Sequence, residues 1–583
     1  MKKKILIISI ILIIVLLTQF YFYFNKREHT ISDEWLYKPA KESFDSIKSS
    51  LTSMSFTSAA TDSTGAAGSV SMFSSKSVQS SNNYLGYSTG GARTIENFRE
   101  NIKNGYFPIS TDITYNGLFY DYSFDTGNAK GESNDLFYPS YSTAVSEDII
   151  SGKKEYYMSV GLNSNIKESD FVRPKLNLVV VLDNSGSMWS SFDSYYYDGN
   201  YTSEYNSETR KSKMEIANNS VNILLDQLNQ DDRFGMVIFN SEGNIAKYLN
   251  KLEDTNINNL KENISDIEAT GGTNFEDGYK KALEIFDNLS ENDKNYQNRI
   301  IVITDAMPNT GYTGSDGLMD LVEKSAKKNI YTSFVGVGVD FNTELIEKLG
   351  TVTGANYYSV HNEEEFEKQM GEDFDFMVTP LVFDLNLDFE SKDYTLEAIY
   401  GTDVENNKKG NIMHVNTLFP SRRNGNGEVK GGIILLKLTK KNNSDNGKIT
   451  LKVSYKDRNQ EKHENEQIVI FDRDNEYYDN TGIRKAIVLT RYANLLKDWI
   501  LFERSNGNKK FIITDDTGII YPNYDEDQIT RILGEHERTS VKLTVSENFK
   551  ELFREMRNYL EVEMEELNDD TLDQEIKILE RLI

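Results

Sequence analysis

The apolar run Leu178–Leu182 is the feature that most constrains this chain, because it ends abruptly in the sequence Asp183-Asn184-Ser185-Gly186-Ser187. Five consecutive apolar residues, three of them valine, are typical of a strand buried on both faces of a parallel sheet. Open α/β sheets bind their ligands at the carboxyl ends of such strands. One carboxylate and two hydroxyls on a short loop can point into one small volume, and oxygen ligands suit a hard divalent cation such as Mg²⁺. The segment therefore predicts a metal site at the mouth of a sheet.

Two later segments complete this pattern. Thr270-Gly271-Gly272-Thr273-Asn274 is a glycine loop that can bring the Thr273 hydroxyl close to a ligand, and Arg299–Thr304 is a second apolar strand that ends in the carboxylate of Asp305. Three loops in this order resemble the metal-ion-dependent adhesion site (MIDAS) of the von Willebrand factor type A (VWA) domain. The resemblance covers residues 177–378.

The resemblance implies a set of metal ligands. Ser185, Ser187 and Thr273 would coordinate directly, Asp183 and Asp305 directly or through water, and a carboxylate of a protein partner would take the last position. Mg²⁺ is the expected cation, with Mn²⁺ or Ca²⁺ as alternatives. Family variants with a second metal carry acidic residues after the serines; here that stretch is Met188-Trp189-Ser190-Ser191, so we expect one metal.

Composition and missing motifs argue against several classes of function. The net charge of −27 over 583 residues argues against nucleic acid as a partner, because neutralising phosphates requires clustered Lys and Arg. The absence of cysteine excludes disulfides and zinc–thiolate sites. No phosphate-binding loop of the form G-x-x-x-x-G-K-[ST] occurs, so no nucleotide is expected. The metal loops supply no His or spare Glu as a general base, so we do not expect an enzyme.

The N-terminus predicts membrane attachment. Met1-Lys2-Lys3-Lys4 precedes an almost uninterrupted apolar stretch, Ile5–Phe24, which is long enough to cross a bilayer and lacks a small-residue cleavage site. We expect an uncleaved signal anchor over residues 1–27, with the following residues outside the cytoplasm; cleavage would instead release a secreted protein. Residues 28–90, rich in Ser and Thr, predict a flexible stalk.

The rest of the chain predicts several units. Residues 177–378 alternate strands with helices, which is typical of a doubly wound, mostly parallel α/β sheet. Residues 379–475 switch to a two-residue period and predict a β-sandwich. Residues 91–176 are β-rich, include a strand expected at 118–124, and are expected to belong to the same sandwich. The VWA domain would then be either inserted in the sandwich or flanked by it. Residues 476–583 predict helices. This arrangement loosely resembles bacterial membrane-anchored VWA proteins and the heavy chains of inter-α-trypsin inhibitor.

A long aromatic loop follows the metal loop. Tyrosine offers a large amphipathic contact area at low entropic cost, so such loops bind partners well. We hypothesise that the loop supplies specificity beside the metal; the alternative is a loop that packs on its own domain. The candidate contact residues are Tyr195, Tyr196, Tyr197, Tyr201 and Tyr205.

These features favour a membrane-anchored, extracytoplasmic adhesion protein whose VWA domain captures an acidic side chain of a protein ligand through a divalent cation. The alternative is a structural or chaperone-like component of an envelope assembly, in which the same domain is a fixed docking module.

Overall fold

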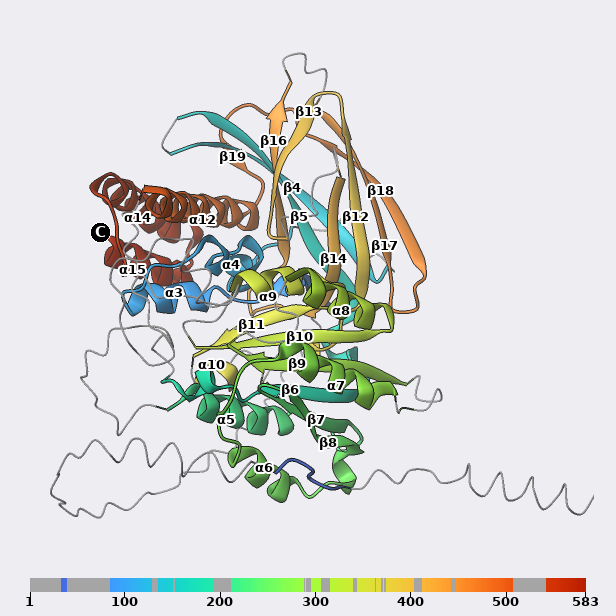
Figure 1. Cartoon of the computed structure of the whole chain (residues 1–583). Helices are drawn as coiled ribbons and strands as arrows, with labels where there is room; N and C mark the ends of the chain where they lie inside the picture. The colour runs from blue at the N-terminus through green and yellow to red at the C-terminus, as the bar shows by residue number, and fades with distance from the viewer. Residues whose placement is uncertain are drawn as a thin grey trace, which may run out of the picture.

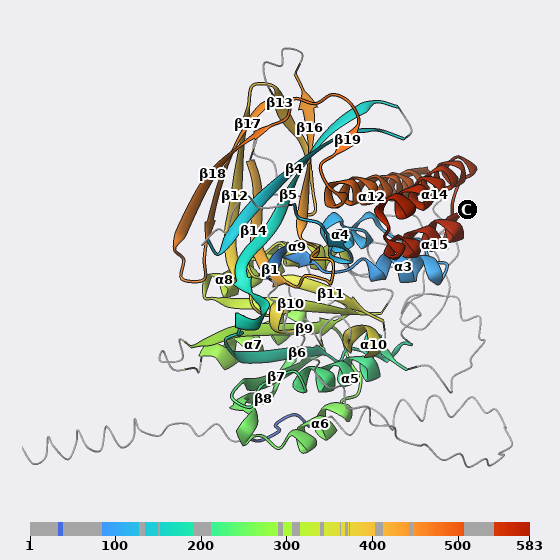
Figure 2. The same ribbon diagram turned by 180° about the vertical axis from the view of Figure 1, so that it is seen from behind.

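The chain is described here from a computed structural model. The described residues are 33–38, 84–127, 135–149, 152–191, 211–287, 289, 295–305, 315–338, 343–361, 363–367, 371, 374–402, 412–441, 447–506 and 542–583. Figures 1 and 2 show a mostly parallel sheet with its helices, an antiparallel sheet that stands above this unit, and C-terminal helices packed at one side.

The first sheet has seven strands within the described residues, six in parallel pairings and the edge strand β8 antiparallel. Its order is β2 (Gly91–Ala92), β11 (Asn356–Val360), β10 (Ile330–Val337), β9 (Tyr296–Thr304), β6 (Lys175–Asp183), β7 (Arg233–Phe239) and β8 (Gly243–Lys251). The doubly wound sheet expected from the alternation of strands and helices is therefore present. The edge strand β2 comes from the segment that was expected to belong to the β-rich unit.

Helices cover both faces of this sheet. In β6, Leu178, Val180 and Leu182 face one apolar cluster, whereas Val179 and Val181 face another. This alternation explains why an unbroken apolar run is needed. The first face carries α5 (Lys213–Leu225), α6 (Ile257–Ser265), α10 (Glu363–Phe366) and α11 (Phe374–Met377), and the second carries α7 (Phe275–Asp287), α8 (Ser315–Lys327) and α9 (Thr343–Gly350).

The second sheet is antiparallel and joins ten strands within the described residues. Its main path runs β13 (Tyr394–Tyr400), β16 (Ile433–Lys440), β5 (Lys154–Lys167), β1 (Tyr84–Thr89), β14 (Ile412–Ser421), β12 (Val382–Ser391), β17 (Lys448–Lys456) and β18 (Lys462–Ile470), while β4 (Phe137–Glu147) pairs with β5 and β19 (Tyr477–Tyr478). A sandwich of two separate sheets stays unconfirmed, because hydrogen bonds join all these strands into one sheet.

Strands from before and after the parallel sheet pair directly with each other. β1 pairs with β14, and β5 pairs with β16. The chain therefore leaves the antiparallel sheet, builds the α/β unit and returns.

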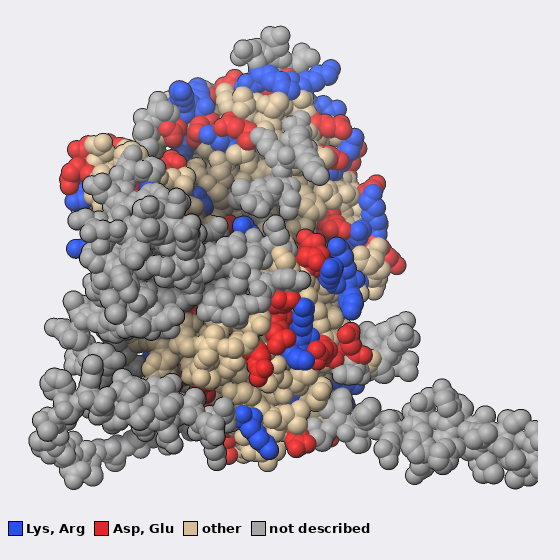
Figure 3. Space-filling model, in the orientation of Figure 1, with Lys and Arg blue, Asp and Glu red and all other residues tan. Residues whose placement is uncertain are grey.

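Acidic and basic side chains are interspersed over the face of the antiparallel sheet in Figure 3.

Two parts of the predicted stalk, residues 28–90, are ordered into the fold, and the stalk prediction is wrong there. Residues 33–38 lie against the α/β unit, with the backbone N–H of Leu36 donating to the carbonyl of Ala246 (2.8 Å), and residues 84–89 form β1. Both segments carry aromatic side chains that pack into apolar clusters, which the high Ser and Thr content of their surroundings obscured. Residues 39–83 lie outside the described residues.

Residues 118–124 do not form the expected strand. They belong to helix α4 (Tyr115–Tyr120) and the two-residue strand β3 (Ser123–Phe124), which pairs with β15 (Val429–Lys430). The Thr114 hydroxyl caps α4 by accepting from the backbone N–H of Gly117, and capping of this kind stabilises a helix start. Leu118 and Phe119 are buried in an apolar cluster, so their burial reflects helix packing.

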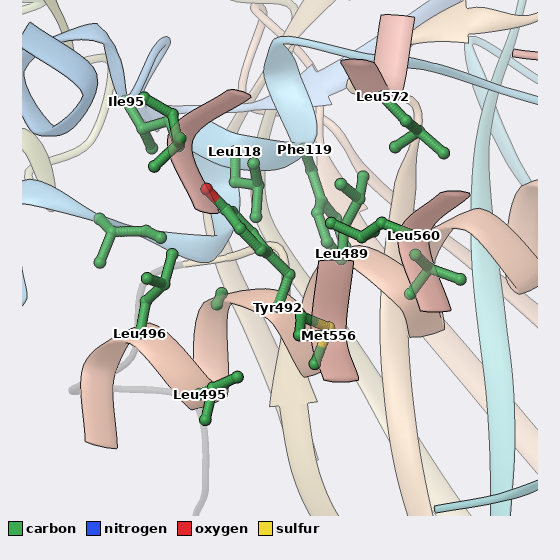
Figure 4. Close-up of a cluster of buried hydrophobic side chains, with 14 of the residues drawn as sticks. Ile95, Leu118, Phe119, Leu489, Tyr492, Leu495, Leu496, Met556, Leu560 and Leu572 are labelled. Carbon is green, nitrogen blue, oxygen red and sulfur yellow. The ribbon is translucent and has the colours of Figure 1, made fainter. Parts of the chain in front are cut away.

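That cluster also holds the C-terminal helices. α12 (Thr481–Asn506), α14 (Glu547–Leu567) and α15 (Asp573–Leu582) pack with α3 (Glu96–Lys103) and α4 around shared side chains. Figure 4 shows Tyr492 of α12 extending toward Leu118, with Met556 and Leu560 of α14 close by. The predicted helical C-terminal region is therefore part of the same folded body.

No helix among the described residues is long and apolar enough to cross a membrane. The anchor predicted at residues 1–27 lies outside those residues.

A buried ion pair joins helix α15 to helix α3. Arg99 of α3 forms ion pairs with Glu575 of α15 and with Asp121; the Arg99 side chain is 4% exposed and that of Glu575 is completely buried. Removing the cation leaves a buried carboxylate without its cationic partner, so Arg99→Met is expected to lower the free energy of unfolding by about 3–5 kcal/mol. Urea denaturation measures the change.

Two further variants interpret that result. Arg99→Met/Glu575→Gln should recover part of the loss, because it removes the stranded charge. Lys324→Ala, which breaks an exposed pair with Asp320, should change stability little. If Arg99→Met lowers the free energy of unfolding no more than Lys324→Ala does, this ion pair does not hold the C-terminal helices to α3.

Candidate metal centre

The parallel pairing of β6 with β9 brings two acidic strand ends together. The register pairs Leu182 with Ile303, so Asp183 and Thr304 follow as neighbours. The Thr304 hydroxyl donates to Oδ2 of Asp183 (2.6 Å), and Asp305 is the next residue after β9. Both carboxylates are completely buried.

The loop that follows β6 brings its two serines close to these carboxylates. Oδ1 of Asp183 accepts from the backbone N–H of Ser185 (2.8 Å), which fixes the start of the turn. The hydroxyl oxygens of Ser185 and Ser187 lie 3.1 Å apart. A short 3₁₀ turn, Gly186–Trp189, then carries the chain away.

The glycine loop is bonded to this first loop. The backbone N–H of Gly186 donates to the carbonyl of Gly271 (2.9 Å), and that of Thr270 donates to the carbonyl of Asn184 (2.6 Å). Gly271 has φ of +79°, a left-handed conformation that favours glycine. Thr273 follows and is buried. All five predicted ligands thus have buried side chains and lie at one edge of the sheet, Asp183 at the end of β6 and the other four on loops.

The electrostatics of this edge favour a bound cation. Burial, and next the charge of Asp305, raise the pKa of Asp183 to about 7. Two buried carboxylates in such proximity repel each other, and a cation between them relieves that repulsion. Together with the serine and threonine hydroxyls they form an all-oxygen donor set, which fits a hard divalent ion.

Lys213 belongs to the site and was missed from the sequence. It opens α5, is completely buried, and its Nζ lies 3.2 Å from Oδ2 of Asp305. The signal was weak, because a lysine in the first turn of a helix is normally solvated. Its burial depends on α5 packing directly behind the first loop.

Asn184 was also overlooked, although it lies between two predicted ligands. Its backbone N–H donates to the carbonyl of Phe239 (2.9 Å). Its side-chain amide donates to the carbonyl of Glu268 (3.0 Å) and to the hydroxyl of Tyr37 (3.2 Å). Asn184 therefore joins β7, the approach to the glycine loop and the segment 33–38.

The proposed aromatic contacts are not tested by this arrangement. Tyr195, Tyr196, Tyr197, Tyr201 and Tyr205 lie outside the described residues. Trp189, at the end of the metal loop, is 61% exposed and places a large aromatic surface beside the site.

Comparison with known proteins agrees with this geometry. A family model described as the von Willebrand factor type A domain matches residues 177–372. Inter-alpha-trypsin inhibitor heavy chain H2 of Sus scrofa is 23% identical over 225 residues, which cover 38% of this chain and 22% of that protein. Heavy chain H4 of Homo sapiens is 23% identical over 219 residues, covering 37% of this chain and 21% of that protein.

The chain therefore spans only about a fifth of the length of these relatives. Among solved structures, a von Willebrand factor type A protein from Catenulispora acidiphila is 13% identical, with a TM-score of 0.39, over 70% of this chain and 99% of that one. The family match, the relatives and the seven-stranded fold together show that this chain contains a von Willebrand factor type A domain.

Proposed function

We propose that this protein is a membrane-anchored, extracytoplasmic binding protein whose VWA domain captures an acidic side chain of a protein partner through one divalent cation. VWA domains are in general protein-interaction modules, which supports the coarser part of this proposal. The more specific proposal, capture of a carboxylate through a bound cation, is supported by one observation. The fully buried carboxylates of Asp183 and Asp305 lie beside the paired hydroxyls of Ser185 and Ser187.

Each group has a defined task in this proposal. Ser185, Ser187 and Thr273 hold the cation directly, and Asp183 and Asp305 hold it directly or through water. The cation, Mg²⁺ or alternatively Mn²⁺ or Ca²⁺, supplies an electrophilic position for a carboxylate oxygen of the partner. We propose binding without catalysis, because the metal loops offer no general base.

The charges of the site support an acidic ligand. Asp183, Asp305 and Lys213 together carry a formal charge of −1 when both acids are ionised. A divalent cation changes this to +1, and a carboxylate from a partner returns it to zero. Lys213 therefore leaves the metal-loaded site with a positive charge, which in a buried setting attracts an anion strongly.

Membrane attachment through residues 1–27 is the second part of the proposal and rests on the sequence alone. It places all described residues on the outer side of the membrane. The aromatic loop that follows Trp189 is proposed to supply specificity, in keeping with the exposure of Trp189 beside the metal loops.

Metal binding is expected to stabilise the fold. At a Mg²⁺ concentration 100-fold above the dissociation constant, the free energy of unfolding should rise by about 2.7 kcal/mol, which appears as a higher Tm in calorimetry. Ser185→Ala/Ser187→Ala should lose this shift in Tm. Ser169→Ala should keep it, because Ser169 is an exposed residue in the turn between β5 and β6. An unchanged shift in the double variant would rule out these serines as ligands.

Partner capture should depend on the metal. The full chain in detergent, used as bait on envelope extracts, is expected to retain a protein with Mg²⁺ and to lose it with EDTA or in Ser185→Ala/Ser187→Ala. The partner should also be lost when its own acidic residues are replaced. Retention regardless of metal would refute metal-bridged capture and would place the binding surface on the antiparallel sheet or the C-terminal helices.

Lys213→Met tests the charge argument. Removing a buried positive charge beside the cation should tighten Mg²⁺ binding by about tenfold or more, measured by titration calorimetry. The same change should weaken retention of the acidic partner, because the loaded site becomes neutral. Lys211→Met, at an exposed lysine two residues away, is the control. Weaker Mg²⁺ binding in Lys213→Met would mean that this lysine chiefly supports the loop.

A further inference from the structure

Residues 33–38, Asp33-Glu34-Trp35-Leu36-Tyr37-Lys38, form a strap across one side of the VWA domain (Figure 1, short dark-blue segment). Trp35 and Tyr37 are partly buried, and the residues beside them are exposed, as in an extended strand with one inner face. Both aromatic side chains pack against the apolar cluster under α5 and α6. The strap lies far in sequence from every element it touches.

The strap is fixed at both ends and in its middle. Asp33 forms an ion pair with Lys247 of β8, and its other carboxylate oxygen accepts from the backbone N–H of Asn256 at the start of α6 (3.1 Å). The backbone N–H of Leu36 donates to the carbonyl of Ala246 (2.8 Å). At the far end, the hydroxyl of Tyr37 accepts from the side-chain amide of Asn184 (3.2 Å).

Asn184 gives this last contact its significance. It is completely buried, it lies between the predicted ligands Asp183 and Ser185, and its carbonyl accepts from Thr270 of the glycine loop (2.6 Å). One of its two amide hydrogens goes to Glu268, in the approach to that loop, and the other goes to the strap. A displacement of Asn184 would therefore move both metal-binding loops together.

We propose that the strap is a built-in support of the metal site, and that Tyr37 is a positioning residue that acts on the ligands through Asn184. This inference rests on the proposed metal site. The N-terminal segment thus has a function besides connecting the fold to the membrane: its docking holds the two loops in the geometry that binds the cation.

The main test compares Mg²⁺ affinities of full-length variants by titration calorimetry. Tyr37→Phe keeps the packed ring and removes one hydroxyl, so Mg²⁺ should bind about two- to tenfold more weakly, as expected for one lost hydrogen bond. Tyr156→Phe is the matched control, because it removes the hydroxyl of a tyrosine on β5 of the antiparallel sheet that bonds to Asp474 in the loop between β18 and β19. Its Mg²⁺ affinity should equal that of the unmodified protein.

A double-variant cycle tests the route through Asn184. If Tyr37 acts by holding Asn184, adding Tyr37→Phe to Asn184→Ala should weaken Mg²⁺ binding no further. A Tyr37→Phe effect of the same size in both backgrounds would overturn the inference, as would equal Mg²⁺ affinity in Tyr37→Phe and the unmodified chain. Failure of the unmodified chain to bind any of Mg²⁺, Mn²⁺ and Ca²⁺ would instead overturn the proposed function together with this inference.

Hydrogen exchange provides a measurement that needs no substitution. Coupling between two sites is reciprocal, so a strap that tightens metal binding must itself be held more tightly when metal is bound. The amide of Leu36, which bonds to β8, should exchange about two- to tenfold more slowly with saturating Mg²⁺ than with EDTA. An unchanged exchange rate in a chain that binds Mg²⁺ would overturn the inference and leave the proposed function intact.

Discussion

The parallel register between β6 and β9 is the constraint on which the candidate site depends. It places Asp183 beside Thr304 and brings Asp305 to the same edge, so two carboxylates from distant parts of the sequence share one buried volume. Isolated burial of either charge would be unfavourable by several kcal/mol. The sheet is buried on both faces at this edge, Lys213 points inward toward Asp305, and the glycine loop is hydrogen-bonded to the loop that carries the serines. The fold therefore concentrates negative charge where a cation can neutralise it.

The chain segments that enter and leave the α/β unit are held together, and this fixes the position of the site relative to the antiparallel sheet. Arg173, just before β6, forms ion pairs with Asp232 and with Asp375 of α11, so the entering and leaving chains are held together. Phe171, on the entering chain, stacks on Phe376 of α11, on the leaving chain, with ring centroids 4.9 Å apart. Buried Arg299 donates to the carbonyl of Val378, where the chain leaves the unit. Since β1 and β5 pair with strands that follow the unit, the antiparallel sheet fixes both ends.

Much of this could be predicted from the sequence, because the decisive signals are local. The apolar runs ending at Asp183 and Asp305 and the glycine loop between them predict strands, loops and their chemistry without knowledge of the fold. Lys213, Asn184 and Tyr37 could not be found in this way. Their roles arise from contacts between residues far apart in sequence, such as the bond between Tyr37 and Asn184, and no periodicity marks a six-residue strap inside a Ser- and Thr-rich stretch. The strand expected at 118–124 failed for a related reason: aromatic residues signal burial, and only the cap at Thr114 and the surrounding helices decide that the buried element is a helix.

The strap also limits how far the site can lie from the proposed membrane anchor. With residues 1–27 in the bilayer, as proposed, only ten residues, 28–37, precede the contact with Asn184, and a fully extended chain spans at most about 3.3–3.6 Å per residue. The metal loops are then held within roughly 35 Å of the membrane surface, whereas a free stalk over residues 28–90 could extend to roughly 200 Å. A site on so short a tether reaches partners in the same membrane or in the layer next to it. If residues 1–27 anchor the chain as proposed, the docked strap favours a ligand within the envelope over one on a distant surface. The adhesion and envelope-assembly hypotheses would then place the ligand at a similar distance from the membrane.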